Sequence, residues 1–137
     1  YEISACLVGS EMCIRDRSLD YPDFLIASSE WFAFVPAKEY FDEPGDHADE
    51  LETSVMMHYH PELVNLDEAG NGDYKKFTSQ MLNEKVAWIP RNWQKVSQDT
   101  GIGNPKKASA GKGKKYAEAV VAKYALLFEE LVHKELY

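Results

Sequence analysis

A ten-residue stretch, residues 45–54, constrains the fold of this chain more than any other feature. Pro44 precedes the stretch, Gly45 opens it, and an apolar run follows it. Between them lie one histidine, His47, and four carboxylates. This order of a turn, polar residues and apolar residues predicts a helix over residues 48–59 that Pro61 terminates. Because a glycine turn delivers His47 to the start of that helix, the turn can aim the imidazole into a cleft.

Carboxylates at the start of the predicted helix have an ordinary structural explanation. Asp46 is expected to cap the helix by accepting a hydrogen bond from one of its free amides. Glu50 and Glu52 would lie in the first turn, where the positive end of the helix dipole favours a negative charge. Asp46 is therefore interpreted as a cap rather than as a metal ligand.

Apolar periodicity predicts both strands and helices elsewhere in the chain. The short apolar runs at residues 23–27 and 85–90 are typical of buried strands. Residues 113–134 give the clearest helix, because apolar side chains recur there every three or four positions. Strands mixed with helices indicate an α/β fold. The apolar stripe of the last helix consists of Tyr116, Val120, Tyr124, Leu127 and Leu131.

The opening stretch resembles a family signature. In the creatininase (creatinine amidohydrolase) family the pattern is Asp-x-His-Ala-Gly-Glu-x-Glu-Thr-Ser, followed by a short helix that ends in Pro-Glu-Leu-Val. Here Asp49 replaces the glycine, and residues 61–64 supply the ending. The segment at residues 104–113 is also similar to the family, with Gly111 in place of a glutamate. The resemblance covers Trp31 to the C-terminus, and it implies a three-layer α/β/α fold of which this chain is the C-terminal part.

The first 17 residues have a separate explanation. Residues 7–17 resemble the in-frame translation of a transposase-type sequencing adapter. Residues 1–3 fit the constant adapter sequence before the index, residues 4 and 5 fit the index itself, and Cys6 fits a codon that ends in constant sequence. Segments of this origin are set aside before a fold is predicted. We therefore expect residues 1–17 to be an adapter artefact and residues 18–137 to be the C-terminal portion of a creatininase-like domain. The alternative is a genuine amphipathic N-terminus.

The family resemblance implies hydrolysis of an amide bond with the help of divalent metal ions, zinc or manganese. Two metal ions can polarise the carbonyl group and generate hydroxide, and a positioned histidine can carry a proton to the leaving nitrogen. His47 matches the catalytic histidine of the family, which contacts the substrate and transfers protons. Trp31 lies roughly where a tryptophan of the family covers the active site, and packing in the core is the equal alternative.

Other positions near the motif bear on the reaction and its substrate. Glu50 has two interpretations: it orients His47 or a metal-bound group, or it bonds backbone amides at the helix start. The second interpretation is favoured for Glu52. Creatininase itself has a second tryptophan four residues before its catalytic histidine, where this chain has Glu43. Glu43 therefore argues against creatinine as the substrate and for another cyclic or linear amide, and Asp49 in place of glycine leaves the substrate class open.

The metal ligands of the family come from its N-terminal half: a Glu-x-His pair, an aspartate and a loop that contains Gly-His. None of these patterns precedes Trp31 here. We therefore expect the full-length parent to be a homo-oligomeric enzyme that acts on a small amide, and the chain as written to lack the ligands and to be inactive alone. The alternative is a metal-free member of the family that serves as a binding or assembly subunit.

Composition argues against some partners. A formal net charge of −8 opposes binding to a phosphate backbone, so no nucleic acid partner is expected. No apolar run approaches the roughly 20 residues of a membrane-spanning helix, so no membrane is expected and the cytoplasm is the default location.

The lysines of residues 106–115 are interpreted as a solvated patch rather than as a phosphate site. Trp88 and Trp93 are interpreted as core or subunit-interface residues.

Overall fold

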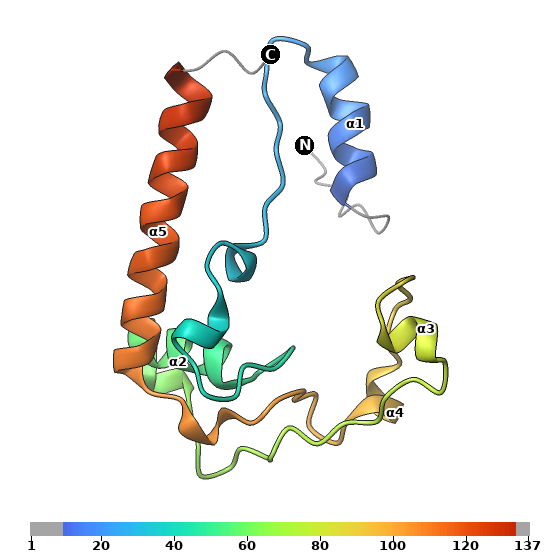
Figure 1. Ribbon diagram of the computed structural model, residues 1–137, viewed down its shortest axis with the longest axis vertical. Helices are drawn as coiled ribbons and strands as arrows, with labels where there is room; N and C mark the ends of the chain where they lie inside the picture. Colours follow the sequence, from blue (N-terminus) through green and yellow to red (C-terminus); the bar gives the residue numbers. More distant parts are fainter. Residues whose placement is uncertain (1–9, 134–137) are drawn as a thin grey trace. The chain divides into compact units, whose positions relative to one another are not determined.

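The computed structural model describes residues 10–133 (Figure 1). The contacts within the chain divide it into two units, residues 1–31 and residues 32–137. No helix within the described range is both long enough and apolar enough to cross a membrane. Residues 1–9, which belong to the predicted adapter segment, lie outside the described residues. The origin of that segment stays a prediction.

The described part of the first unit begins with the helix α1 (Ser10–Asp20). The chain turns directly after it, because the amide of Tyr21 donates to the carbonyl of Arg17 (2.9 Å) and the amide of Phe24 donates to the carbonyl of Tyr21 (3.1 Å). The turn brings the rings of Tyr21 and Phe24 edge to face, with their centroids 6.3 Å apart. Beyond the turn the chain has no regular secondary structure until Trp31.

The second unit is organised around two helices, α2 (Glu50–Tyr59) and α5 (Ala110–His133). The helix predicted over residues 48–59 is confirmed, and the amide of its C-cap, His60, donates to the carbonyl of Met56 (2.7 Å). Pro61 follows as predicted and opens a separate short helix. The remaining helices are short connections: η1 (Trp31–Ala33), η2 (Ala37–Glu39), η3 (Pro61–Leu63), α3 (Gln80–Asn83), α4 (Trp93–Val96) and η4 (Pro105–Lys107).

Small residues let α2 and α5 approach each other closely. A Cβ atom at Gly113 would overlap the carbonyl oxygen of Ser54, so the backbones of the two helices meet there without an intervening side chain. The hydroxyl of Ser54 is fully buried and accepts a hydrogen bond from the amide of Ser109 (3.0 Å). One turn further along α5, the fully buried Tyr116 donates its hydroxyl proton to the carbonyl of Phe32 (2.9 Å). These contacts fix the start of α5 against α2.

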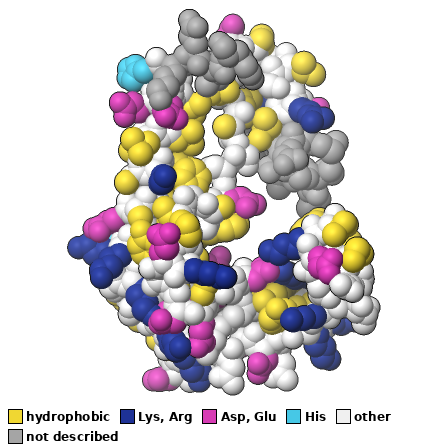
Figure 2. All heavy atoms as spheres, in the orientation of Figure 1, with side chains coloured by type: hydrophobic (Ala, Val, Ile, Leu, Met, Phe, Trp, Pro, Cys, Tyr) yellow, Lys and Arg dark blue, Asp and Glu magenta, His cyan; other side chains and the backbone are white. Residues whose placement is uncertain are grey.

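The apolar stripe of α5 is buried only over its first turns. The helix was predicted from residue 113 and begins three residues earlier, at Ala110. Tyr116 and Val120 are buried, and Tyr124 is half-buried against Phe34, with ring centroids 4.1 Å apart. Figure 2 shows hydrophobic side chains at the surface over the later turns of α5. The later residues of the stripe, Leu127 and Leu131, are half-buried. The exposed large apolar residues of α5 lie outside the stripe: Val121, Leu126, Phe128 and Val132.

The strands predicted at residues 23–27 and 85–90 are wrong, because neither segment forms a strand. A strand needs a neighbour to bond its amides and carbonyls, and both apolar runs are instead exposed, with Phe24 at 69% and Trp88 at 83%. Pairing within residues 10–133 is limited to two isolated antiparallel bridges, His47 with Ile102 and Tyr74 with Ser97. The predicted three-layer α/β/α arrangement is therefore not seen in the described part of the chain.

Candidate functional site

The backbone around His47 is fixed by a loop far along the chain. The amides of Asp46 and His47 both donate to the carbonyl of Ile102 (2.8 and 3.1 Å), and the amide of Ile102 donates back to the carbonyl of His47 (2.8 Å). Ile102 is 3% exposed, so this anchor is part of the core. A Cβ atom at Gly45 would lie 2.5 Å from the same carbonyl oxygen, which explains the glycine. The backbone turn that carries His47 is therefore held in place by its hydrogen bonds to Ile102.

The helix begins just after this turn, and Asp49 is its cap. The Asp49 carboxylate accepts from the amide of Glu52 (2.9 Å) and from the amide of Gly45 (2.5 Å), and Asp49 is 4% exposed. Glu52 adds a second bond at the helix start, because its carboxylate accepts from the amide of Ala48 (2.7 Å). This differs by one residue from a capping box, in which the acceptor would bind the amide of the cap itself. The prediction that Asp46 caps the helix is wrong. The aspartate that replaces the family glycine does so instead, because it directly precedes the first helical residue.

Asp46 is bound by an arginine from a distant segment. The Arg91 guanidinium donates two hydrogen bonds to the Asp46 carboxylate (3.0 and 2.5 Å). Hydrogen bonding and charge lower the pKa of Asp46 and raise the pKa of Arg91 from their usual values. The guanidinium carbon also lies 5.5 Å from the centroid of the Trp93 ring, a cation–π distance. The Trp93 ring is in turn 5.1 Å from the His47 ring.

The sequence thus did not identify Trp93 as a neighbour of His47, or Arg91 as a neighbour of Asp46 and Trp93. Trp93 was interpreted as a core or interface residue, but it lies against the candidate catalytic side chain. The only sequence signal for this placement was an Arg-x-Trp pattern after a proline, which has no fixed meaning by itself. Spatial proximity across more than 40 residues has no local signature, so spacing could not reveal the contact.

The His47 imidazole faces a carboxylate on one side. Its Nδ1 atom lies 3.5 Å from Oε2 of Glu52, within ion-pair distance, and the His47 side chain is 47% exposed. The ring is therefore accessible from solvent while its position is defined by the carboxylate of Glu52 and the indole of Trp93. Such an environment suits a group that exchanges protons with a bound molecule.

Glu50 faces the opposite direction, toward α5. It is fully buried, accepts a hydrogen bond from the amide of Glu43 (2.7 Å) and forms an ion pair with Lys112. Lys112 also binds Asp42 (2.7 Å), and Lys107 binds Glu43 (2.7 Å). These are contacts of a structural ion-pair network, and a catalytic role for Glu50 stays a prediction. The two lysines are occupied by carboxylates, so they do not form a phosphate site.

Trp31 belongs to the first unit of the chain, and the predicted metal ions have no ligand cluster among the residues described. Trp31 is the first residue of η1 and is half-buried at the end of the first unit, so its substrate contact stays a prediction. Within residues 10–133, no group of three or more His, Cys, Asp or Glu side chains is placed to hold a metal ion. The residues described here therefore do not fit a metal centre.

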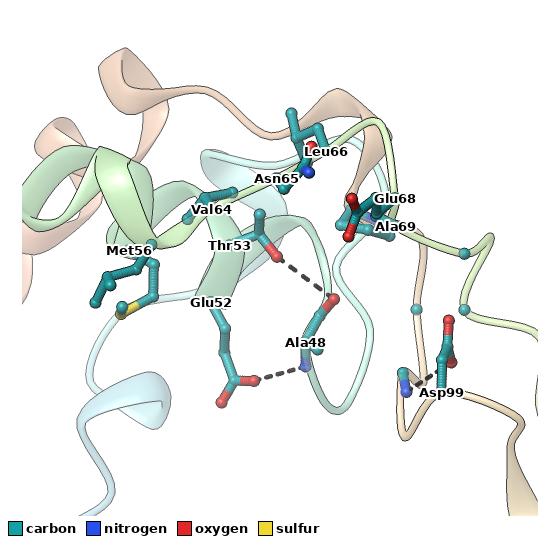
Figure 3. Close-up of a pocket in the computed structure, with 16 residues that line it drawn as sticks. Ala48, Glu52, Thr53, Met56, Val64, Asn65, Leu66, Glu68, Ala69 and Asp99 are labelled. Carbon is teal, nitrogen blue, oxygen red and sulfur yellow. Dashed lines mark hydrogen bonds between the residues drawn. The ribbon is translucent and has the colours of Figure 1, made fainter.

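A pocket of about 440 Å³ adjoins the start of α2 (Figure 3). Ala48, Glu52, Thr53 and Met56 line one side, and Figure 3 shows the Glu52 carboxylate and the Thr53 hydroxyl both bonded to Ala48. The residues that line it include three carboxylates and no lysine, arginine or histidine. Glu52 thus belongs both to the pocket and to the surroundings of His47. The other two carboxylates are Glu68 and Asp99.

Comparison with known proteins places this chain in a family. Its sequence matches the creatininase family (creatinine amidohydrolase) over residues 11–128. The chain therefore belongs to the creatininase family, as the motif around His47 predicted. No match was found among proteins with curated descriptions.

A solved structure shares this fold. It is that of a protein from Bacteroides fragilis NCTC 9343 that is assigned as a creatinine amidohydrolase. The two are 56% identical in sequence and superpose with a TM-score of 0.86. The match covers 94% of this chain and 51% of the Bacteroides protein. The chain thus spans about half the length of that relative, and the creatininase-like fold is confirmed over this half.

Proposed function

We propose that the whole protein is an amidohydrolase that breaks the C–N bond of a small cyclic or linear amide, with His47 as its proton-transfer residue. The observation that carries this proposal is the setting of His47. The imidazole stands on a braced turn, half-exposed, between the carboxylate of Glu52 and the indole of Trp93. Membership of the creatininase family supports the reaction class.

The chemistry needs a group of this kind because an amide nitrogen is a poor leaving group until it is protonated. A positioned imidazole can accept a proton from the attacking water and deliver it to that nitrogen, typically a contribution of about 100- to 10,000-fold. Dependence on divalent zinc or manganese belongs to the proposal for the whole protein. It requires ligands other than the residues described, and no step above depends on it.

The substrate is proposed to be a small amide other than creatinine. Glu43 stands where creatininase has a tryptophan, and its carboxylate is bound by Lys107 (2.7 Å) and by the side-chain amide of Asn104 (3.1 Å). An aromatic wall for a flat ring is therefore replaced by a charged network. The pocket beside Glu52, with its apolar side chains and backbone glycines, offers room for a small amide.

The proposal is tested on the protein encoded by the complete gene. Native DNA upstream of Ser18 is read by a method that uses no adapter, and the resulting protein is assayed with formamides, lactams and short peptides. The assays are run after chelation and after addition of zinc or manganese. His47→Ala should lower kcat by at least about 100-fold. Full activity of His47→Ala would exclude the proposed role of this residue.

The second candidate is a binding or assembly subunit without catalysis. The exposed apolar side chains of α5 favour it, since Phe128 is 61% exposed and Val132 is 74% exposed, and large exposed apolar surfaces commonly mark protein contacts. A homo-oligomer is proposed for both candidates, and sedimentation of the full-length protein tests it. An oligomer that hydrolyses no amide under any metal condition would select the second candidate. A cytoplasmic location stays a prediction.

A further inference from the structure

We infer that Glu52 is the positioning residue for His47: its carboxylate holds the Nδ1 side of the imidazole and leaves Nε2 for proton exchange. The inference deepens the proposed function and depends on it only for the catalytic consequence. The contact that carries it is the 3.5 Å between Nδ1 of His47 and Oε2 of Glu52. This is longer than a formed N–H···O bond, as is common for catalytic contacts before a substrate binds.

Glu52 is held in place for this role by its own hydrogen bond. The same oxygen, Oε2, accepts from the amide of Ala48 (2.7 Å), and the amide of Glu52 donates to Asp49 (2.9 Å). Ala48 has a φ of 49°, in the left-handed region that non-glycine residues seldom adopt. This conformation follows directly after His47, so one carboxylate oxygen stabilises the unusual turn and faces the ring that the turn presents.

Asp46 and Arg91, two charged groups of this region, are paired with each other. Asp46 is neutralised by the two hydrogen bonds from Arg91, and Arg91 lies over the ring of Trp93. Trp93 contributes an uncharged face to the imidazole. Among the residues from 10 to 133, His47 is the side chain within ion-pair distance of Glu52. The Glu52 carboxylate therefore interacts with the His47 ring and with the backbone amide of Ala48.

The consequence is a choice of tautomer. A carboxylate at Nδ1 favours a neutral imidazole that carries its proton on Nδ1. The lone pair of Nε2 is then free to accept the proton of the attacking water, and the same nitrogen returns that proton to the leaving amide nitrogen. Glu52 itself neither gains nor loses a proton in this sequence. Its effect on the reaction is exerted through His47.

The tautomer is measured by nitrogen NMR of the labelled chain at about pH 9, well above the usual pKa of an imidazole. In the unmodified protein, His47 should show a larger fraction protonated at Nδ1 than it does in Glu52→Ala. Glu52→Gln keeps an acceptor oxygen for both Ala48 and the ring, so it should preserve most of that fraction. An unchanged tautomer ratio in Glu52→Ala would overturn the inference.

A second carboxylate–histidine pair in the chain provides the matched control. Glu62 lies 3.2 Å from Nδ1 of His60 at an exposed position. Glu62→Ala should change the signal of His60 and leave that of His47 unaltered, whereas Glu52→Ala should do the reverse. A change at both histidines in both variants would indicate a general disturbance of the helix and would also overturn the inference.

Activity of the full-length protein gives an independent measurement. Glu52→Ala should lower kcat by about 10- to 100-fold with a smaller change in KM, and Glu52→Gln should recover most of the loss. If His47→Ala is fully active, the proposed function fails while the tautomer result stands. If His47→Ala is inactive and Glu52→Ala is as active as the unmodified protein, the proposed function stands and the positioning role fails.

Discussion

At the scale of single residues, the cap of α2 is Asp49 and not Asp46, the aspartate three positions earlier that the sequence suggested. Both residue types are good helix caps, and the choice depends on which one directly precedes the first helical residue. Asp49 does, with extended φ and ψ of −84° and −168°. Asp46 is instead taken by Arg91, which lies 45 residues away. The aspartate in place of the family glycine is therefore explained by its role as the helix cap.

The cap gives a prediction about stability. Asp49→Ala removes an acceptor from two amides, those of Glu52 and Gly45, at a buried position, so it should lower the free energy of unfolding by about 1–2 kcal/mol. Asp46→Ala breaks a partly exposed ion pair and should cost less than about 1 kcal/mol. Urea unfolding of both variants measures the difference. A larger loss for Asp46→Ala would contradict the assignment of the cap.

The arginine clamp gives a prediction about protonation. Hydrogen bonding to Arg91 is the main reason that the pKa of Asp46 lies below its usual 3.8. Arg91→Met should therefore raise the pKa of Asp46 toward that value, as followed by carbon NMR of its carboxyl group. Lys107→Met is the control, since it should raise the pKa of Glu43 and leave Asp46 unchanged. No rise at Asp46 in Arg91→Met would show that the clamp is not formed in solution.

At the scale of elements, two glycines near the start of α5 differ in whether the fold requires them. Gly113 lies where a Cβ atom would overlap the backbone of α2, whereas a Cβ atom at Gly111 would meet nothing within 4 Å. The family has a glutamate at the position of Gly111, and the open space agrees with that. The glycine there costs helix propensity without providing a contact.

These positions predict substitutions of opposite sign. Gly111→Ala should raise the free energy of unfolding by up to about 1 kcal/mol, through helix propensity alone. Gly113→Ala should lower it by more than about 2 kcal/mol, because α2 and α5 must move apart. Thermal unfolding of the two variants, each with the same chemical change two positions apart, compares them directly. Equal effects would mean that the close crossing of the helices is absent.

Elements also show which parts of the fold the sequence could predict. Helices α2 and α5 were predicted because their apolar periodicity, Pro61 and the capping residues all act locally. Helices α3 and α4 have four residues each and carry no period. The strand predictions failed because an apolar run becomes a strand only when another segment pairs with it. His47 was found through its motif, while Trp93 and Arg91 reach it only through the tertiary fold.

At the scale of the whole molecule, an ion-pair network joins the loop before α2, the first turn of α2 and the start of α5. Lys112 binds Asp42 and Glu50, while Lys107 binds Glu43. The pairing lowers the pKa values of Asp42 and Glu43, mainly through hydrogen bonds from Lys112 and Lys107 respectively. The network connects segments more than 60 residues apart, so its titration reports on the tertiary structure of the second unit.

The carboxylates of this network, together with Asp46 in its pair with Arg91, predict a fold that loses stability in acid. Because Asp42, Glu43 and Asp46 bind protons more weakly when folded than when unfolded, the unfolded state takes up more protons in acid and stability falls as pH falls. The stabilisation that these paired carboxylates provide should be complete above their usual pKa values of 3.8 to 4.5. It should be lost as the pH falls through the lowered pKa values that the same groups have in the folded protein. Urea midpoints measured from pH 7 to pH 2 test this.

Salt and one substitution separate the network from a general acid effect. Since Asp42 and Glu43 are exposed, about 0.5 M salt should screen their pairing and flatten the acid side of the profile. Lys107→Met should remove the contribution of Glu43 and keep most of that of Asp42, which depends mainly on Lys112. The fall of stability in acid should therefore be less steep than in the unmodified protein. A urea midpoint that stays constant or rises between pH 5 and pH 3 would show that these carboxylates are unpaired in solution. The attachment of α5 to α2 would then depend on the close approach at Gly113 and on the buried Tyr116, and not on the ion pairs.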